Sequence, residues 1–413
     1  MPTTVNDVDP AVVVDYDHIH GPEVLAWPPG AMDGFREERP IFFSSRYGGF
    51  WVLTRYDDIR AVVQDSVTFR QHADGLPRAP YSKIHIPLML NPPEHGKYRR
   101  TMTPIFAPRM IAKLEPVVRG VIRDQLARIA PQGRADFVDD LCMIPPAAMF
   151  CGMLGIDPAN FPAFNKVSVE LIFGAADVLA REGEEAARAF RARISTTIDA
   201  MLEPILEDRR SHPGDDILSI LLDAEVDGRR LTADEMLNIA SLLFFAGTDS
   251  TASIMSYAFL FLAHSPEHRR FIVENLGSPE VITKAAAELI RYNAFHQIRR
   301  VAARDTALCG QIIRQGDIVV LPMQAANHDS RRFPDPLTVD FGRSNAAAAA
   351  LTFSGGPHRC IGQHLATLQL RMMLEETHAV IPDYRLDRGH PHEYMTSHAK
   401  TVLRHLPMAW DIG

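Results

Sequence analysis

Cysteine is scarce in this chain, and its few residues are far apart. The four cysteines are Cys142, Cys151, Cys309 and Cys360, and no two of them form a C-x-x-C pair. A disulfide framework or a structural zinc site needs several suitably spaced cysteines, so neither is expected. The simplest compartment for such a chain is a reducing cytoplasm.

Long hydrophobic runs are also missing. No uninterrupted apolar stretch reaches the roughly 18 residues that a membrane helix needs. Residues 1–10 contain no basic segment followed by an apolar run, so no signal peptide is expected. The formal net charge of -8 gives no indication of a nucleic-acid partner.

The chain shows no Gly/Ser linker and no internal repeat, whereas its composition is that of a globular enzyme. Hydrophobic residues make up 46% of the chain and charged residues 23%. We therefore expect one domain over residues 1–413, with a short lead-in over residues 1–20. Apolar runs at 41–43 and 50–53 flank Gly48-Gly49 and predict a β-hairpin. A further short strand is expected at 318–321.

Most of the remaining sequence has helical periodicity. Apolar residues recur at three- and four-residue spacings in residues 108–130, 137–154 and 182–209. Thr232 and Glu235 match a capping box, which would open an apolar helix running to about Ser265. At 1.5 Å per residue that helix would be roughly 50 Å long. Serine-proline pairs at Ser265 and Ser278 predict two more helix starts, and a last helix is expected from near Ile361. The fold should therefore be mainly α with small β-sheets.

The segment Phe353-Ser-Gly-Gly-Pro-His-Arg-Cys360-Ile-Gly362 is the most informative one. Its glycines and proline predict a tight loop, and Cys360 comes directly before the last helix. Backbone amides and the positive end of that helix would favour a thiolate at Cys360. A thiolate with amide donors suits a soft ligand to haem iron. Two other interpretations are a buried inert cysteine and the nucleophile of a cysteine hydrolase with His364 as its base.

Two distant motifs bear on this choice. Together with the cysteine loop, Glu288-Leu-Ile-Arg291 and Ala246-Gly-Thr-Asp-Ser250 resemble the three motifs of the cytochrome P450 family in order and spacing. The resemblance runs from about Phe42 to Trp410, and within the family the chain looks most like bacterial camphor hydroxylases. Residues 91–94, 265–269, 362–366 and 406–410 carry that last likeness.

The resemblance implies a cytochrome P450 fold that holds haem b (iron protoporphyrin IX). The haem would lie between the long central helix and the cysteine-loop helix. Cys360 would be the iron ligand, and Phe353 and Gly362 would belong to the haem-binding loop.

The resemblance also implies an oxygen-activating role for the middle of the long helix. Ala246 and Gly247 either allow close helix packing or leave room for O2 above the iron. Asp249 would connect the site to bulk protons, and the next hydroxyl would order the proton donor. Serine stands at 250 where the family usually has threonine. Because serine lacks the methyl group that restricts the rotamer, we expect turnover with leakier coupling. Thr251 is the alternative for the hydroxyl role.

Haem propionates need cationic or N–H partners, since buried carboxylates without them are costly. By resemblance, four residues would fill that role: His95, Arg99, Arg300 and His358. Glu288 and Arg291 would form a structural ion pair under the haem, joined by an arginine from residues 327–332.

The chain is too short to include flavin domains, and it has no G-x-G-x-x-G motif after a strand, so its electrons must come from another protein. By resemblance, the donor would be a [2Fe-2S] ferredoxin served by an NAD(P)H-dependent reductase. A basic docking patch for that acidic partner is predicted from Lys97, Arg99, Arg100, Arg109 and Arg359. The alternative is an ordinary solvated helix face.

Substrate contacts in this fold would come from several separate segments. The expected pocket residues are Tyr81, Ile84, Ile86, Leu242, Phe245, Phe295, Ile298 and Met395. Their mostly apolar side chains suit a compact lipophilic substrate, such as a monoterpenoid or a small aromatic molecule. Tyr81 or His85 would supply a polar contact. Lys83 falls where camphor hydroxylases grip the camphor ketone with a tyrosine, which argues against camphor itself.

The sequence thus predicts a haem-thiolate monooxygenase that inserts one atom of O2 into its substrate. The alternative is a haem-thiolate sensor or ligand-binding protein without turnover. Asp249 and Ser250 would be unnecessary in a sensor, so their presence favours the enzyme.

Overall fold

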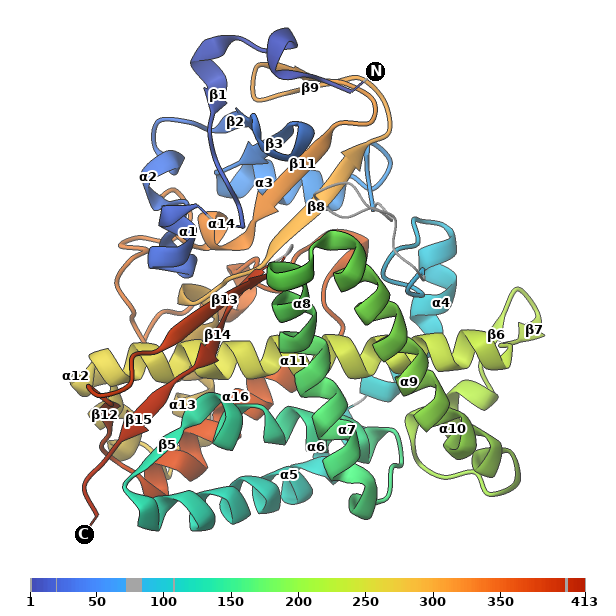
Figure 1. Cartoon of the computed structure of the whole chain (residues 1–413), viewed down its shortest axis with the longest axis vertical. Helices are drawn as coiled ribbons and strands as arrows, with labels where there is room; N and C mark the ends of the chain where they lie inside the picture. The colour runs from blue at the N-terminus through green and yellow to red at the C-terminus, as the bar shows by residue number, and fades with distance from the viewer. Residues whose placement is uncertain (1, 20, 72–83, 107, 398–399, 413) are drawn as a thin grey trace.

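The computed structural model describes residues 2–19, 21–71, 84–106, 108–397 and 400–412. The long helix α11 (Ala233–His264) crosses the molecule, with other helices gathered around it and the largest sheet at one end (Figure 1). The longer helices around α11 are α4 (Glu94–Met102), α5 (Pro108–Ile129), α6 (Ile144–Met153), α7 (Phe161–Val169), α8 (Ala175–Glu182), α9 (Glu184–Ser211), α12 (Pro266–Glu274), α13 (Pro279–Tyr292) and α16 (Gln363–Val380).

Shorter helices connect these parts. They are α1 (Pro22–Ala26), α2 (Asp33–Arg36), α3 (Tyr56–Gln64), α10 (Ile217–Leu222), α14 (Met323–Asn327) and α15 (Ala346–Ala349), with the 3-10 turn η10 (Gly356–His358) and the π-helical segments η7 (Val138–Cys142) and η9 (Glu170–Gly174). Within the described part of the chain, no helix is long and apolar enough to cross a membrane.

The main sheet joins segments that are far apart in sequence. Its strand order is β1 (Val13–Val14), β2 (Ile41–Ser44), β3 (Phe50–Leu53), β11 (Ile318–Pro322), β8 (Gln297–Ala302) and β4 (Phe69–Arg70). Smaller sheets pair β5 (Arg134–Asp136) with β15 (Pro407–Ala409) and β12 (Arg385–Leu386), and β13 (Glu393–Ser397) with β14 (Lys400–His405). Two hairpins complete them: β6 (Glu225–Val226) with β7 (Arg229–Arg230), and β9 (Thr306–Leu308) with β10 (Gln311–Ile313).

The predicted fold class is confirmed. The hairpin forms with Ile41 opposite Leu53, and β11 covers the third predicted strand. The capping box closes α11, since the Glu235 amide donates to Thr232 Oγ1 and the Thr232 amide donates to Glu235 Oε2.

Several predicted boundaries need correction. The helix expected over 137–154 is split into η7 and α6, and the last helix begins at Gln363 rather than Ile361. Ser265 and Ser278 do precede α12 and α13, but neither side chain makes a capping hydrogen bond. Proline at the first helical position supplies the start in both cases.

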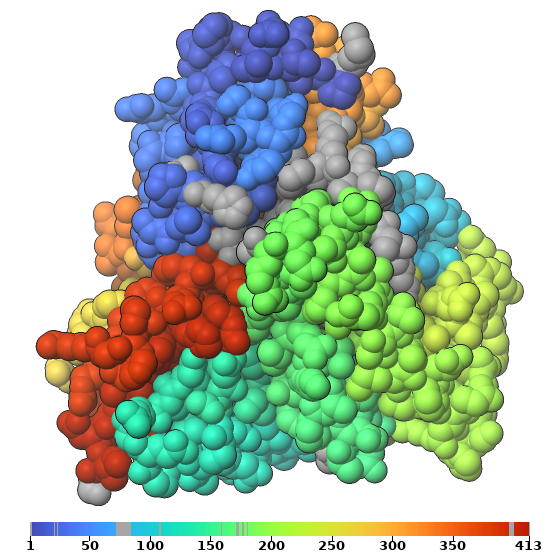
Figure 2. Space-filling view, viewed as in Figure 1, coloured from blue at the N-terminus to red at the C-terminus, as the bar shows by residue number. Residues whose placement is uncertain are grey.

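Buried apolar residues form two clusters. The larger lies among the helices around α11, and the smaller lies between the main sheet and α3. On the face shown in Figure 2, the C-terminal strands lie beside the N-terminal region, and β13 contacts α8. The C-terminal strands thereby reach the middle of the molecule, where α11 passes.

Candidate active site

The cysteine loop is held tightly against α3. The Cys360 amide donates to the Phe353 carbonyl at 2.9 Å, which closes the loop before α16. Gly356 has φ +61, and a Cβ atom there would lie 2.3 Å from the Val63 carbonyl oxygen. Only glycine fits both that backbone conformation and that contact. The hydrogen bond within the loop and the contact of Gly356 with α3 together fix the position of the loop that carries Cys360.

The surroundings of Cys360 act on its thiol in opposite directions. Desolvation by the surrounding protein raises the pKa of the thiol, whereas the Gly362 amide, Arg99 and Arg359 lower it. The predicted amide donor at the start of the last helix is therefore present. A metal cation bound to the sulfur would favour the thiolate further, since a coordinating thiol is deprotonated. His364 is exposed and its ring contacts Gln363, which gives no support to a cysteine hydrolase.

Gly247 and Ala246 have different roles in α11. A Cβ atom on Gly247 would lie 1.7 Å from a ring carbon of Phe150 on α6, so this glycine is required for close helix packing. Ala246 is exposed although most of the surrounding helix is buried. The packing interpretation therefore holds for Gly247, whereas Ala246 is accessible and makes no such packing contact.

The polar residues that follow also separate by role. Ser250 is partly exposed, and its hydroxyl donates to the Ala246 carbonyl at 2.5 Å. Thr251 is buried on another side of the helix, which makes Ser250 the better candidate for the hydroxyl role. Asp249 Oδ2 forms an ion pair with the Lys400 ammonium on β14, and Asp249 Oδ1 is buried without a hydrogen-bond partner among the described residues.

Four basic residues meet beside the cysteine loop, as predicted. His95 and Arg99 come from α4, Arg300 from β8 and His358 from η10. Burial lowers the pKa of His358 to about 3, and repulsion from His95, Arg300 and Arg99 adds to this effect. Burial likewise lowers the pKa of Arg300 to about 10. Such mutual repulsion between buried basic groups favours an anionic partner.

These residues fit an iron porphyrin. The Cys360 sulfur offers a soft metal ligand. The four basic residues match two propionates, and His358 Nε2 is buried without a hydrogen-bond partner in the described part of the chain. Ala246 is exposed in the middle of the otherwise largely buried α11. A cysteine ligand, a group of basic residues beside it and a long helix with an accessible residue in mid-span define the class of haem-thiolate oxygenases.

The structural ion pair is confirmed, but its predicted third member is wrong. Arg291 donates to both oxygens of Glu288, each at 2.8 Å, and Arg343 donates to Glu288 Oε1 at 3.0 Å. The arginine therefore comes from position 343 and not from residues 327–332. Asn327 instead accepts from Arg291 through its carbonyl at 2.7 Å. The sequence does not reveal the pairing of Arg343 with Glu288, because it depends on how residues 327–343 fold against α13.

The structure brings only part of the predicted substrate pocket together. Tyr81, like Lys83, lies outside the described residues. Phe295 is a buried member of the larger core cluster, and Ile86, Phe245 and Met395 are partly buried and pack against it. Leu242 is buried but lies outside both clusters, and Ile298 packs in the sheet cluster. Ile84 is 54% exposed, so its side chain does not lie in a buried pocket. Its backbone carbonyl accepts a hydrogen bond from the Asn238 side chain.

Three residues near this site were not predicted. Asn238 on α11 donates to the Ile84 carbonyl and accepts from the Ile86 amide. His296 forms a β-bridge with Lys400, and burial lowers the pKa of His296 to about 4. Asn238 could have been noticed in the sequence, because it is a polar residue within the apolar run of α11. Nothing in the sequence around Lys400 indicates that it lies near the site.

The predicted docking patch is only partly exposed. Arg100, Arg109 and Arg359 are exposed, as a docking patch requires. Lys97 is paired with Glu94 and Asp227, each at 2.7 Å. Arg99 turns inward and donates to the Arg359 carbonyl.

Comparison with known proteins agrees with this geometry. The family model described as cytochrome P450 matches residues 160–378. A probable cytochrome P450 127A1 from Sinorhizobium fredii is 30% identical over 92% of this chain and 85% of its own length. The erythromycin C-12 hydroxylase of Saccharopolyspora erythraea is 32% identical over 90% of this chain and 92% of its own.

Solved structures agree as well. The crystal structure of cytochrome P450 CYP101C1 has a TM-score of 0.88 and 28% identity, covering 99% of this chain and 100% of the other. The chain belongs to the cytochrome P450 family. It is a haem-dependent monooxygenase.

Proposed function

We propose that this monooxygenase acts on a small lipophilic substrate, either monoterpenoid-like or a small aromatic molecule. One observation carries the proposal. Partly buried apolar side chains from three separate segments (Ile86, Phe245 and Met395) pack against the larger core cluster, of which Phe295 is a buried member. Sites of this composition bind their ligands mainly by burying apolar surface.

We propose roles for the site residues on the contacts described above. Cys360 is the iron ligand, with Phe353 closing the loop and Gly362 donating to the sulfur. His95, Arg99, Arg300 and His358 hold the propionates. Bound haem supplies the chemistry, the activation of O2 with two electrons and the insertion of one oxygen atom.

Two residues of α11 handle protons in this proposal. The Ser250 hydroxyl, fixed on the Ala246 carbonyl, orients the proton donor beside the exposed Ala246. Asp249 receives protons from the solvent side and passes them toward Ser250. These two residues have no purpose in a sensor without turnover, and several relatives are named as hydroxylases or oxygenases.

A binding screen tests the substrate class. Limonene, p-cymene and erythromycin are added to the ferric holoprotein, and the shift of the Soret band to the high-spin form is followed. Limonene or p-cymene should give a saturating shift, and erythromycin should give none. A shift with erythromycin alone would contradict the proposal, and it is a real alternative because one relative is named for that substrate. Phe245→Ala should weaken limonene binding roughly tenfold or more, since it removes a partly buried apolar side chain that the ligand would cover.

We further propose that electrons come from a [2Fe-2S] ferredoxin with an NAD(P)H-dependent reductase. The exposed guanidinium groups of Arg100, Arg109 and Arg359 support this, because they lie on the segments that carry the cysteine loop and α4–α5. Opposite charges across such a surface speed association. We also propose that residues 1–413 act as one domain.

A further inference from the structure

We propose that Lys400 is a positioning residue for Asp249, holding its carboxylate ionised and in place beside Ser250. The proposal rests on the role proposed above for Asp249. It adds a residue from the C-terminal strands to the proton-handling part of the site.

The first argument is the burial of the lysine. The Lys400 side chain is 15% exposed and that of Asp249 is 19% exposed, and the two form an ion pair. Lysine is almost never buried without a partner. Burial lowers the pKa of Lys400 to about 7, while the contacting carboxylate favours the charged ammonium. The negative charge of Asp249 therefore stabilises the ammonium form of Lys400 at this largely buried position.

The second argument is that the backbone of β14 is fixed against α11 next to Lys400. Tyr257 of α11 is fully buried, and its hydroxyl donates to the Thr401 carbonyl at 2.8 Å. His296 bridges Lys400 itself. Val402 and Leu403 are buried in the core cluster. Lys400 thus projects toward Asp249 from a strand that cannot shift along the helix.

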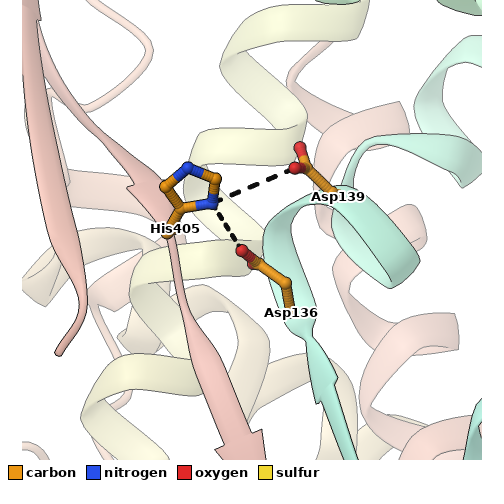
Figure 3. Close-up of side chains that lie close together, drawn as sticks. All are labelled: Asp136, Asp139 and His405. Atoms are coloured by element: carbon orange, nitrogen blue, oxygen red, sulfur yellow. Dashed lines mark hydrogen bonds and ion pairs between the residues drawn. The ribbon is translucent and has the colours of Figure 1, made fainter. Parts of the chain in front are cut away.

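The third argument comes from the other end of β14. His405 Nδ1 lies 2.6 Å from Asp136 Oδ2, and Arg404 donates to both oxygens of Asp139 at 3.0 and 3.1 Å. Figure 3 shows one ring nitrogen of His405 facing both aspartates, which come from β5 and η7. The spacing of these three side chains would suit a metal ion. The aspartate oxygens already accept hydrogen bonds from Arg404 and from the amides of Val138 and Leu406, however. These contacts therefore hold the end of β14 against β5 and η7.

The consequence falls on the two oxygens of Asp249. Lys400 occupies Oδ2, so Oδ1, buried and without a partner among the described residues, is the oxygen left to accept a proton. Without the Lys400 ammonium, a largely buried carboxylate such as that of Asp249, whose side chain is 19% exposed, becomes harder to ionise. Lys400 therefore sets both the orientation and the charge of the proton carrier.

Four variants of the full-length holoprotein test this: Lys400→Met, Lys400→Arg, Asp249→Asn and the double variant Lys400→Met/Asp249→Asn. The control is Lys166→Met, where an exposed lysine lies 4.0 Å from its nearest carboxylate oxygen. Carbon monoxide difference spectra first confirm an intact thiolate-bound haem in each variant.

Thermal unfolding shows whether the pair is real. Each single neutral variant should lower the midpoint more than the double variant does, because a single change leaves one buried charge without its partner. Lys166→Met should leave the midpoint unchanged. Additive losses, with the double variant the least stable, would contradict the proposal.

Infrared difference spectroscopy, which needs no substrate, tests the charge of Asp249. At neutral pH, Lys400→Met should gain the carbonyl band of a protonated carboxyl group. The double variant should lose that band, and Lys400→Arg should never show it. If Lys400→Met shows no such band, the proposed effect on ionisation is wrong.

Coupling is measured below all midpoints with limonene as the probe. Lys400→Met should lower product per NAD(P)H at least threefold, with the difference recovered as peroxide, and Lys400→Arg should restore at least half of the yield. An unchanged yield in Lys400→Met would reduce Lys400 to a purely structural role and overturn the proposal. If the wild type forms no product from limonene, the substrate proposal fails instead, and the infrared result decides on Lys400.

Discussion

The imidazole rings of His95 and His358 lie with their centroids 4.1 Å apart and their planes at 45°. One ring comes from α4 and the other from η10, so the contact joins two segments that are more than 250 residues apart. Burial lowers the pKa of both rings, to about 4 for His95 and about 3 for His358. Neutral rings add no further repulsion beside Arg99 and Arg300, and each neutral imidazole keeps one N–H with which it could donate to an anionic group.

Haem retention tests this cradle. His358→Ala should speed haem loss roughly tenfold or more, because a hydrogen bond to a charged group contributes about 1.5–3 kcal/mol. Transfer of haem to excess apomyoglobin measures the rate. Arg314→Gln, which changes an arginine of the β10–β11 turn outside the cradle, should lose haem at the wild-type rate. Equal rates in all three proteins would rule out a propionate contact at His358.

The tight packing at Gly247 can be tested by a glycine-to-alanine substitution, with the same substitution at Gly120 on α5 as its control. Gly247→Ala should destabilise the protein by about 1–3 kcal/mol through overpacking against Phe150. Gly120→Ala adds the same methyl group where no other atom lies within 4 Å. It should instead stabilise the protein by up to about 1 kcal/mol through helix propensity. Urea unfolding measures both changes, and a loss of equal size at the two sites would contradict the packing argument.

Coupling should depend on the methyl group that Ser250 lacks. Ser250→Thr should raise product per NAD(P)H, because the threonine rotamer is more restricted. Ser250→Ala should lower the yield by removing the hydroxyl that donates to Ala246. Product and peroxide are quantified together for each variant. A lower yield in the threonine variant would show that serine is the better residue in this site.

Charge reversal at Arg100 tests the docking patch. Arg100→Glu should abolish most ferredoxin-dependent turnover while leaving peroxide-driven turnover intact, since only the first needs a protein partner. Arg388→Glu makes the same charge change at an exposed arginine outside the patch and should affect neither reaction. Loss of both reactions in Arg100→Glu would point to damage of the site itself.

Glu235, in the first turn of α11, should make the free energy of unfolding depend on pH. The ion pair with Arg229 lowers the pKa of Glu235 to about 2, against about 4.3 for an ordinary glutamate. A carboxyl whose pKa falls on folding stabilises the protein above its unfolded pKa, and the effect is lost as pH falls through the folded value. The stability gap between wild type and Glu235→Gln should thus stay constant above about pH 5 and shrink toward about pH 2.5. A gap that does not change with pH would contradict this.

Local features were predictable because their causes are local. The capping box at Thr232, the proline starts of α12 and α13 and the tight loop before Cys360 depend on residues a few positions apart. Boundaries within 137–154 were less predictable, because the π-helical turn at η7 follows from packing against α11 and β14. The same limit applies to Arg343, whose contact with Glu288 spans 55 residues.

Residue types at short, fixed spacings were enough to indicate the family, the fold class and the cysteine proposed as the iron ligand. Three other features came from the packing of distant segments: the contact of Gly247 with Phe150, the orientation of Ser250 and Thr251 on different sides of α11, and the pairing of Lys400 with Asp249 across 151 residues. Such contacts depend on how distant segments pack, and burial, which sets the charge of a side chain, exists only once the whole chain has folded.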